Sequence, residues 1–278
     1  MAIHALTSIT GSPGVTTTAL AWAYLTTRPT LIVEADPTGG SAILAGLWDG
    51  AQRHDRSVLD LANYPAGEFA DRLWASTLQL PGLTQRWVLP AIGSGQQSVA
   101  MMPVWPALAA TLRAIADTGT DVLIDAGRIT AADSPWALVD AADTVLVLTR
   151  TNLQSLNALA IALPDLRESL TASGTAQRLG VVAVQGGPRE FRWWPFGMHD
   201  FGVAPYAARE VREIADPIQV VATLPSRARQ AAVYSNGLKA GRLHARRSYV
   251  RTVRHLIEAA TEHAATSRSI MSLEGDPA

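Results

Sequence analysis

The chain has 278 residues and no cysteine, and its formal net charge is −1, from 23 basic and 24 acidic side chains. The lack of cysteine excludes a disulfide scaffold, a zinc ribbon, an iron–sulfur site and a thiol nucleophile. The balanced charge gives no global attraction to nucleic acid or anionic lipid. With 48% hydrophobic and 17% charged residues, we expect a folded, cytoplasmic protein with a sizeable core, no signal peptide and no membrane-spanning run.

Short apolar runs alternate with helical segments along the chain. In chain order we expect a strand at 5–10, a helix at 17–26, strands at 30–35 and 86–92, a helix at 105–117, strands at 121–126 and 143–149, a helix at 153–163, strands at 179–185 and 218–224, and a long helix at 243–265. The strands are continuous Val, Ile and Leu runs, which is typical of strands buried on both faces. The alternation predicts an α/β fold, a three-layer α/β/α sandwich with a mostly parallel sheet.

No linker rich in Gly, Pro or Ser divides the sequence, so we expect a single α/β domain over residues 1–266. Two segments fall outside the alternation. Residues 47–85 are predicted to form a helical insertion at one edge, and residues 186–205 an irregular, aromatic loop insertion. Residues 267–278 are predicted to be a flexible C-terminal tail.

The first strand runs into a glycine-containing turn that precedes a helix. The turn and the helix start comprise Gly11, Ser12, Pro13, Gly14, Val15, Thr16, Thr17 and Thr18. Such a turn aims backbone N–H groups and a helix N-terminus at one point, which suits a phosphate group. Against the P-loop pattern G-x-x-x-x-G-K-[ST], Gly11 fits the first glycine and Thr18 the final hydroxyl. Thr16 then replaces the second glycine and Thr17 the lysine, and all eight residues are candidates for nucleotide binding.

Two acidic residues follow predicted strands. Asp36 comes after the second strand, and Asp125 lies at the end of the apolar run that starts at Asp121. The carboxyl ends of parallel strands meet at one edge of a sheet, where ligands bind. An apolar strand that ends in Asp is the form of a Walker-B magnesium carboxylate. The predicted ligands of Mg²⁺ are therefore Thr18 and Asp125.

On these motifs the chain resembles the ParA/MinD group of deviant-Walker P-loop ATPases, including its pilus- and secretion-associated branch and the MinD-like proteins of actinobacteria. The loop is similar to that family's K-G-G-V-G-K-T-T, and Asp36-Pro37 is similar to its D-x-D-P-Q segment, whose second Asp positions the attacking water. Pro225 matches the late segment whose backbone lies by the adenine. The resemblance covers most of the chain and implies a P-loop NTPase (SIMIBI/ParA-like) fold, a catalytic role for Asp36, ATP or ADP with Mg²⁺ as cofactor, and a face-to-face homodimer.

The loop lacks both lysines of this family. In the register above, Thr17 stands where the family's lysine contacts the β/γ-phosphates, and Ser12 stands where the signature lysine reaches across the dimer. Charge stabilisation is nearly all of phosphoryl-transfer catalysis, and loss of one such donor costs roughly 100- to 1000-fold in rate. The degenerate Walker A loop therefore argues against efficient hydrolysis. Arg128 and Arg150, at strand ends, are candidate replacement cations, and Arg150 is the better one.

Two surfaces are candidates for partner binding. The predicted partner surface in the aromatic insertion comprises Phe191, Trp193, Trp194 and Phe196. Aromatic residues with arginine are typical of interface hot spots, and the alternative is a lid folded on the core. The C-terminal helix alternates arginines with apolar residues, so it either docks on the sheet or binds a membrane surface or DNA non-specifically.

Two functions remain open. The first is a ParA/MinD-like protein with a degenerate nucleotide site that acts as a regulatory or scaffolding partner in partition, cell positioning, or a secretion, pilus or conjugation system. The second is an active, dimerising switch ATPase that uses another cation in place of the lysines. Both imply a cytoplasmic protein, or one peripheral at a membrane or a protein complex. An enzyme of another class has no substrate motif in the sequence.

Overall fold

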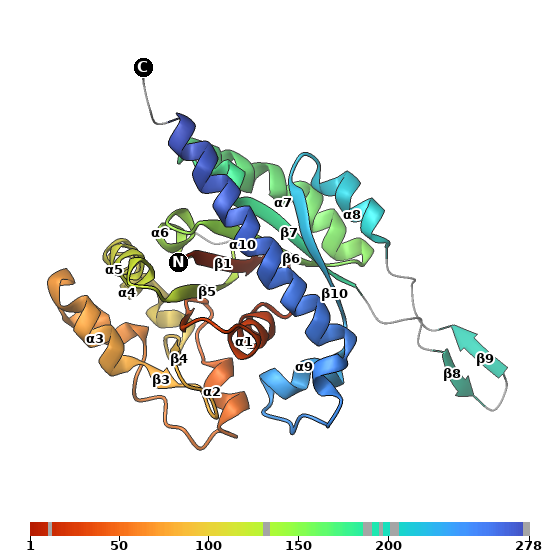
Figure 1. The fold of residues 1–278 in the computed structure, drawn as a ribbon, viewed down its shortest axis with the longest axis horizontal. Coiled ribbons are helices and arrows are strands. Elements are labelled where there is room, and N and C mark those ends of the chain that lie inside the picture. The colour runs from red at the N-terminus through yellow and green to blue at the C-terminus, as the bar shows by residue number, and fades with distance from the viewer. Residues whose placement is uncertain (11–12, 130–133, 186–190, 195–196, 201–205, 275–278) are drawn as a thin grey trace.

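A single eight-stranded sheet forms the centre of the protein (Figure 1). The computed structural model describes residues 1–10, 13–129, 134–185, 191–194, 197–200 and 206–274. Its strands are β1 (Ile3–Ser8), β2 (Thr30–Glu34), β3 (Leu78–Gln79), β4 (Arg86–Leu89), β5 (Asp121–Arg128), β6 (Thr144–Arg150), β7 (Leu179–Gln185) and β10 (Gln219–Pro225). The order across the sheet is β10-β7-β6-β1-β5-β2-β4-β3, and β3 is its antiparallel strand.

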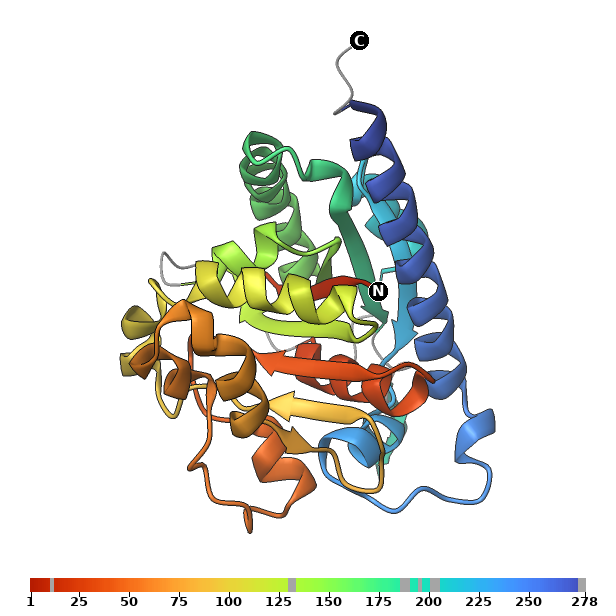
Figure 2. The same cartoon turned by 60° about the vertical axis from the view of Figure 1, so that its left-hand side comes forward.

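Helices cover both faces of the sheet (Figures 1 and 2). They are α1 (Val15–Leu25), α2 (Ala42–Leu47), α3 (Phe69–Ser76), α4 (Ser98–Met101), α5 (Trp105–Asp117), α6 (Trp136–Asp140), α7 (Leu153–Ala172), α8 (Ala208–Ala215), α9 (Ala228–Ser235) and α10 (Ser248–Glu274). Helices α1, α9 and α10 pack on one face, and α5, α6, α7 and α8 pack on the other. This arrangement confirms the predicted three-layer α/β sandwich with a mostly parallel sheet.

Successive strand residues point into two different cores. In β2, Leu31 and Val33 belong to the core beneath α5 and α7, whereas Ile32 between them belongs to the core beneath α1 and α10. All three are fully buried. Because both faces of the sheet are covered, a strand needs apolar residues at consecutive positions. This requirement explains the unbroken apolar runs in the sequence.

Both long helices extend further than the sequence pattern indicates. Helix α7 continues from the predicted end at 163 to Ala172, with Pro164 inside it. Helix α10 begins at Ser248 and runs to Glu274, so the first part of the predicted tail is helical. No Gly or Pro stands between 266 and 274, and the breakers Gly275 and Pro277 come only afterwards.

The two insertions differ in how well they were predicted. Residues 47–85, predicted as a helical insertion, contain 3₁₀ turns, the short helix α3 and the edge strand β3. The aromatic insertion was predicted to be irregular, but its described part forms two antiparallel strands, β8 (Phe191–Trp194) and β9 (Gly197–Asp200). These strands lie to one side of the main sheet (Figure 1). Aromatic residues favour extended backbone, which accounts for the hairpin. Phe196 lies outside the described residues.

Helix α10 docks on the sheet through its apolar stripe. Tyr249, Val253 and Leu256 are at most 4% exposed, whereas Arg251 and Arg254 face solvent. The apolar side of this helix is therefore occupied by the protein's own core. Within the described part of the chain no single helix is long and apolar enough to span a membrane, and one bent pair, Gly95–Met101 with Trp105–Asp117, meets the length and composition together.

A close approach of helices α2 and α9 supplies a stability test. A Cβ on Gly46 would overlap the carbonyl oxygen of Ser235, whereas a Cβ on Gly67 would meet open space. We expect Gly46→Ala to lower the free energy of unfolding by about 1–3 kcal/mol, because overpacking forces the two helices apart. Gly67→Ala is the control and should change it by less than about 0.5 kcal/mol. Urea unfolding measures both, and equal effects of the two variants would contradict the assigned packing.

Candidate functional site

The loop after β1 leads into α1 through a left-handed glycine. Gly14 has φ +95° and is the N-cap of α1, so Val15 is the first helical residue. A residue with a Cβ is strained at this φ, which explains the glycine at this position. The first turn of α1 closes with the Thr18 N–H donating to the Gly14 carbonyl at 2.8 Å. Gly11 and Ser12 lie outside the described residues.

Asp125 of β5 is buried beside the start of α1. It is 2% exposed, and its Oδ1 accepts the backbone N–H of Gly127 at 3.1 Å. The Thr16 hydroxyl donates a second hydrogen bond to this carboxyl group. Burial raises the pKa of Asp125 to about 6, against the lowering effect of these hydrogen bonds. The predicted Walker-B carboxylate thus contacts the loop, and it does so through Thr16.

Thr18, the predicted magnesium hydroxyl, points elsewhere. It is 2% exposed, and its side chain is hydrogen-bonded to that of Tyr249 at the start of α10. Residues two apart on an α-helix are rotated by roughly 200° about its axis, so Thr16 and Thr18 cannot face the same carboxylate. Burial raises the pKa of the Tyr249 hydroxyl. Thr18 of α1 therefore contacts α10 through the side chain of Tyr249.

The helix start is also compatible with a second register of the loop pattern. If Gly14 is the glycine of G-K-[ST], the lysine position is Val15 and the hydroxyl position is Thr16. Val15 is 7% exposed and belongs to the core beneath α1 and α10. In this register, as in the one taken from the sequence, the lysine position is uncharged.

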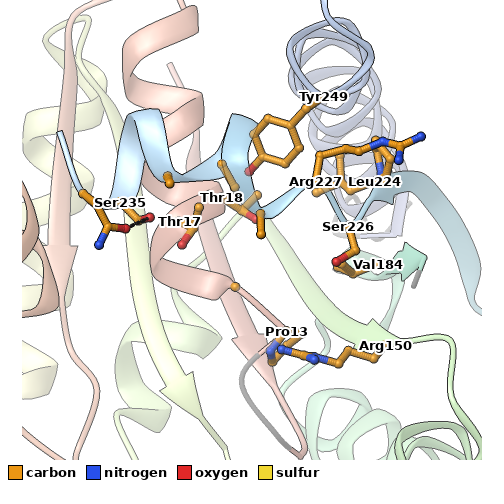
Figure 3. A pocket seen from close by; sticks show the side chains of 16 residues that line it. Pro13, Thr17, Thr18, Arg150, Val184, Leu224, Ser226, Arg227, Ser235 and Tyr249 are labelled. Carbon is orange, nitrogen blue, oxygen red and sulfur yellow. Dashed lines mark hydrogen bonds between the residues drawn. The ribbon is translucent and has the colours of Figure 1, made fainter. Parts of the chain in front are cut away.

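A cavity of about 400 Å³ opens beside the loop (Figure 3). Its lining comprises Pro13, Gly14, Thr17, Thr18, Arg150, Val184, Leu224, Pro225, Ser226, Arg227, Ala228, Ala231, Ala232, Ser235, Asn236 and Tyr249. The loop, the ends of β6, β7 and β10, helix α9 and the start of α10 meet here. Five predicted nucleotide-binding residues, Pro13, Gly14, Thr17, Thr18 and Pro225, are among them. Hydroxyl and apolar groups dominate the walls.

Asp36 lies against the end of β5. Its carboxyl group covers Gly127, where a Cβ would overlap it, and Gly127 has φ +59°. Its Oδ1 accepts the Thr38 N–H at 2.9 Å and the Thr38 hydroxyl at 2.7 Å. Its negative charge also contributes to the raised pKa of Asp125. The fold therefore brings the two predicted carboxylates together at the carboxyl edge of the sheet.

A third carboxyl group at this edge was not singled out from the sequence. Glu34 ends β2, pairs in register with Asp125 and is 3% exposed. It accepts a hydrogen bond from the Ser41 hydroxyl and longer ones, at 3.4 Å, from the N–H groups of Ile43 and Ala91. Burial raises the pKa of Glu34 to about 8, and the charge of Asp125 adds to the shift. The signal in the sequence that could have identified Glu34 is its position two residues before Asp36.

These donors fit magnesium and a nucleotide in part. A carboxylate and a hydroxyl, Asp125 and Thr16, are hard oxygen donors of the kind that bind Mg²⁺ together with phosphate. The cavity has the apolar and hydroxyl lining that suits a base and a ribose, and this lining does not include Asp125 or Thr16. No loop lysine faces the phosphate position, and the chain's one lysine, Lys239, is exposed and lies outside the cavity lining.

No protein-family model matches the sequence, and no curated protein matches it. Solved structures do match the fold. The ATP complex of McdA from Cyanothece aligns with a TM-score of 0.67 and 18% identity, over 95% of this chain and 96% of that one. MinD with Mg-ADP from Pyrococcus horikoshii gives 0.65 and 14%, over 96% and 98%. The MinC–MinD complex from Aquifex aeolicus gives 0.63 and 16%, over 100% and 98%. The chain has the MinD/ParA P-loop NTPase fold.

The buried carboxyl group of Glu34 predicts a pH-dependent stability. Its pKa rises from 4.5 to about 8 in the folded protein, so the folded state keeps a proton that the unfolded chain has lost. Stability therefore falls as the pH rises between about 4.5 and 8. We expect Glu34→Gln, which mimics the protonated form, to flatten this decline.

Urea unfolding at pH 5 and pH 8.5 measures the effect, and exposed Glu68, changed to Gln, is the matched control. The free energy of unfolding of Glu34→Gln relative to wild type should increase with pH, while that of Glu68→Gln should stay parallel to wild type. Parallel curves for all three proteins would refute the assignment.

Proposed function

We propose that this protein is a ParA/MinD-like P-loop protein that binds a nucleotide with Mg²⁺ at a degenerate site, hydrolyses it poorly, and acts as a regulatory or scaffolding partner of another protein. The observation that carries the proposal is the contact of Thr16 with Asp125 at the start of α1. The cavity opens beside the same helix start, where Gly14, Thr17 and Thr18 line it. A loop kept only as a strand-to-helix connection would need neither a buried carboxylate nor a hydroxyl directed at it.

In this proposal Thr16 and Asp125 hold Mg²⁺, the backbone of Gly14 and the first turn of α1 hold phosphate, and Pro225 borders the base. Asp36 would position a water molecule beside the phosphates. When bound, Mg²⁺ neutralises charge on the phosphate oxygens. The chain's own residues bind and orient the nucleotide, and the loop adds no positive charge to stabilise a transferring phosphoryl group.

We base action through protein contact on the expected weak catalysis and on one solved structure with this fold. One of the structures with this fold is a complex of MinD with MinC. In the present chain the aromatic hairpin, with Phe191, Trp193 and Trp194, is our proposed partner surface, and Phe196 is included from the sequence. We also propose that the protein forms a homodimer through the carboxyl edge of the sheet. Membrane contact is less favoured, because the apolar stripe of α10 is buried. DNA contact is less favoured, because the net charge of the chain is −1.

The second candidate is an active switch ATPase of the ParA/MinD type, in which another cation replaces the lysines. The observation in its favour is that Arg150 lines the cavity together with Pro13 and Gly14 of the loop. Partition, cell positioning, and secretion, pilus or conjugation systems are the settings proposed for either candidate.

A pair of threonine variants tests the magnesium assignment. We expect Thr16→Val to weaken ADP binding in Mg²⁺ by on the order of tenfold or more, because it removes a metal ligand. Thr18→Val should leave the dependence on Mg²⁺ intact, since Thr18 contacts Tyr249. Calorimetric titration with ADP, with and without Mg²⁺, measures both variants beside Asp125→Ala. If only Thr18→Val abolishes the Mg²⁺ effect, the sequence-based register of the loop is the correct one.

Lysine restoration separates the two candidate functions. With Gly14 as the cap, Val15 is the lysine position, so Val15→Lys should raise ATP turnover by ~100-fold or more if the rest of the site is intact. Thr17→Lys is the control for the alternative register. Phosphate release is measured for wild type and both variants. Rapid hydrolysis by the wild type, with no gain in either variant, would favour the active switch ATPase.

A further inference from the structure

Arg150 stands at the end of the strand next to the loop. Strand β6 pairs directly with β1, with Leu148 opposite Ser8, the last residue of β1. Arg150 lies two residues beyond Leu148 and is opposite Val184 of β7 on its other side. Parallel strands end at the same edge of the sheet, so Arg150 is held beside the point where the chain leaves β1 for the loop.

The side chain of Arg150 turns toward the loop. Figure 3 shows it extended from the end of β6 toward Pro13, and both residues line the same cavity. The other cationic side chain in the lining, Arg227, comes from the N-terminus of α9 and points away from the loop in the same view. Arg128, at the end of β5, is outside the lining.

A phosphate group bound beside the loop would need a nearby cation. Asp36 and Asp125 place negative charge at the edge of the sheet, and the described part of the loop, Pro13 and Gly14 with the first turn of α1, carries no positive side chain. A nucleoside diphosphate or triphosphate would add several negative charges within a few ångströms. Mg²⁺ on the Thr16–Asp125 side offsets part of this charge, and the opposite side of the loop faces β6.

We propose that Arg150 is the phosphate-binding cation of this site and supplies from β6 the charge that a loop lysine supplies in other P-loops. The inference rests on the proposed nucleotide binding. Strand β1 lies between β5 and β6, so Asp125 and Arg150 flank the loop from opposite sides. A guanidinium presents a planar fork of N–H donors that matches two phosphate oxygens, and such charge-assisted bonds are the strong ones.

This placement makes a prediction about which part of a ligand Arg150 contacts. The adenine and ribose would lie along the β10 and α9 side of the cavity, where Leu224, Ala231 and Tyr249 line it. Arg150 would contact only the phosphates. Its removal should therefore weaken the binding of ATP and ADP and leave the binding of adenosine unchanged.

Calorimetric titration of the full chain with ATP, ADP and adenosine in Mg²⁺ tests the proposal, using wild type, Arg150→Met, Arg150→Lys and Arg128→Met. We expect Arg150→Met to weaken ADP and ATP binding by about 10- to 100-fold, with adenosine binding unchanged as an internal check on folding. Arg150→Lys should recover part of the loss, because it restores the charge without the fork. Arg128→Met should bind all three ligands as wild type does.

The outcomes separate the two proposals. ADP bound equally well by wild type and Arg150→Met would overturn the role of Arg150 and leave nucleotide binding standing. An equal loss for adenosine and ADP would also overturn it, because the arginine would then shape the cavity and not bind phosphate. If wild type binds neither ATP nor ADP at millimolar concentration, the proposed function and this inference both fail.

Discussion

The pairing of β1 between β5 and β6 is the constraint on which the site depends. Two carboxylates fix it at the amino edge of the sheet: Asp121 accepts the Ala2 N–H at 3.1 Å, and Asp143 accepts the Ile3 N–H at 2.7 Å. Each also pairs with an arginine, Arg28 at 3.3 Å and Arg113 at 3.0 Å respectively. From this end, β1 keeps one register with β6 from His4 to Ser8, and its register with β5 shifts between Leu6 and Ser8. The opposite end of β1 therefore meets the ends of the same two neighbours.

That register explains why residues far apart in sequence converge. Leu6 is opposite Asp125 on one side, and Ser8 is opposite Leu148 on the other, so the loop leaves β1 between the Asp125 carboxylate and the Arg150 guanidinium. Helix α1 then runs back along the sheet, which brings Thr16 to Asp125. On its other side, Thr18 meets Tyr249 and ties the C-terminal helix to the loop. A change in the pairing of β1 would move all of these groups together.

The sheet and its layers were predictable because burial on both faces leaves a signal in consecutive apolar residues. The positions of Asp36, Asp125 and Gly14 near the carboxyl edge of the sheet could also be predicted from the sequence, since each residue stands at the end or start of such a run. The orientation of the threonines could not be predicted, because the spacing of the motif fits two registers, and the position of Gly14 as the N-cap of α1 is seen only in the structure. The contact of Thr18 with Tyr249 joins residues far apart in the sequence, which local patterns do not encode. The pairing of β8 with β9 was not predicted, although the aromatic residues of β8 favour extended backbone.

The loop contains no lysine, so any positive charge near it has to come from other groups. Three carboxyl groups, those of Glu34, Asp36 and Asp125, gather at one edge, and full ionisation of all three would repel any phosphate. Burial raises the pKa of Glu34 to about 8, so near neutral pH it adds little negative charge. In our proposal the charge of the remaining two carboxylates is offset by Mg²⁺ on one side of the loop and by Arg150 on the other. In the proposed arrangement neighbouring strands support phosphate binding, and the described part of the loop supplies no charged side chain.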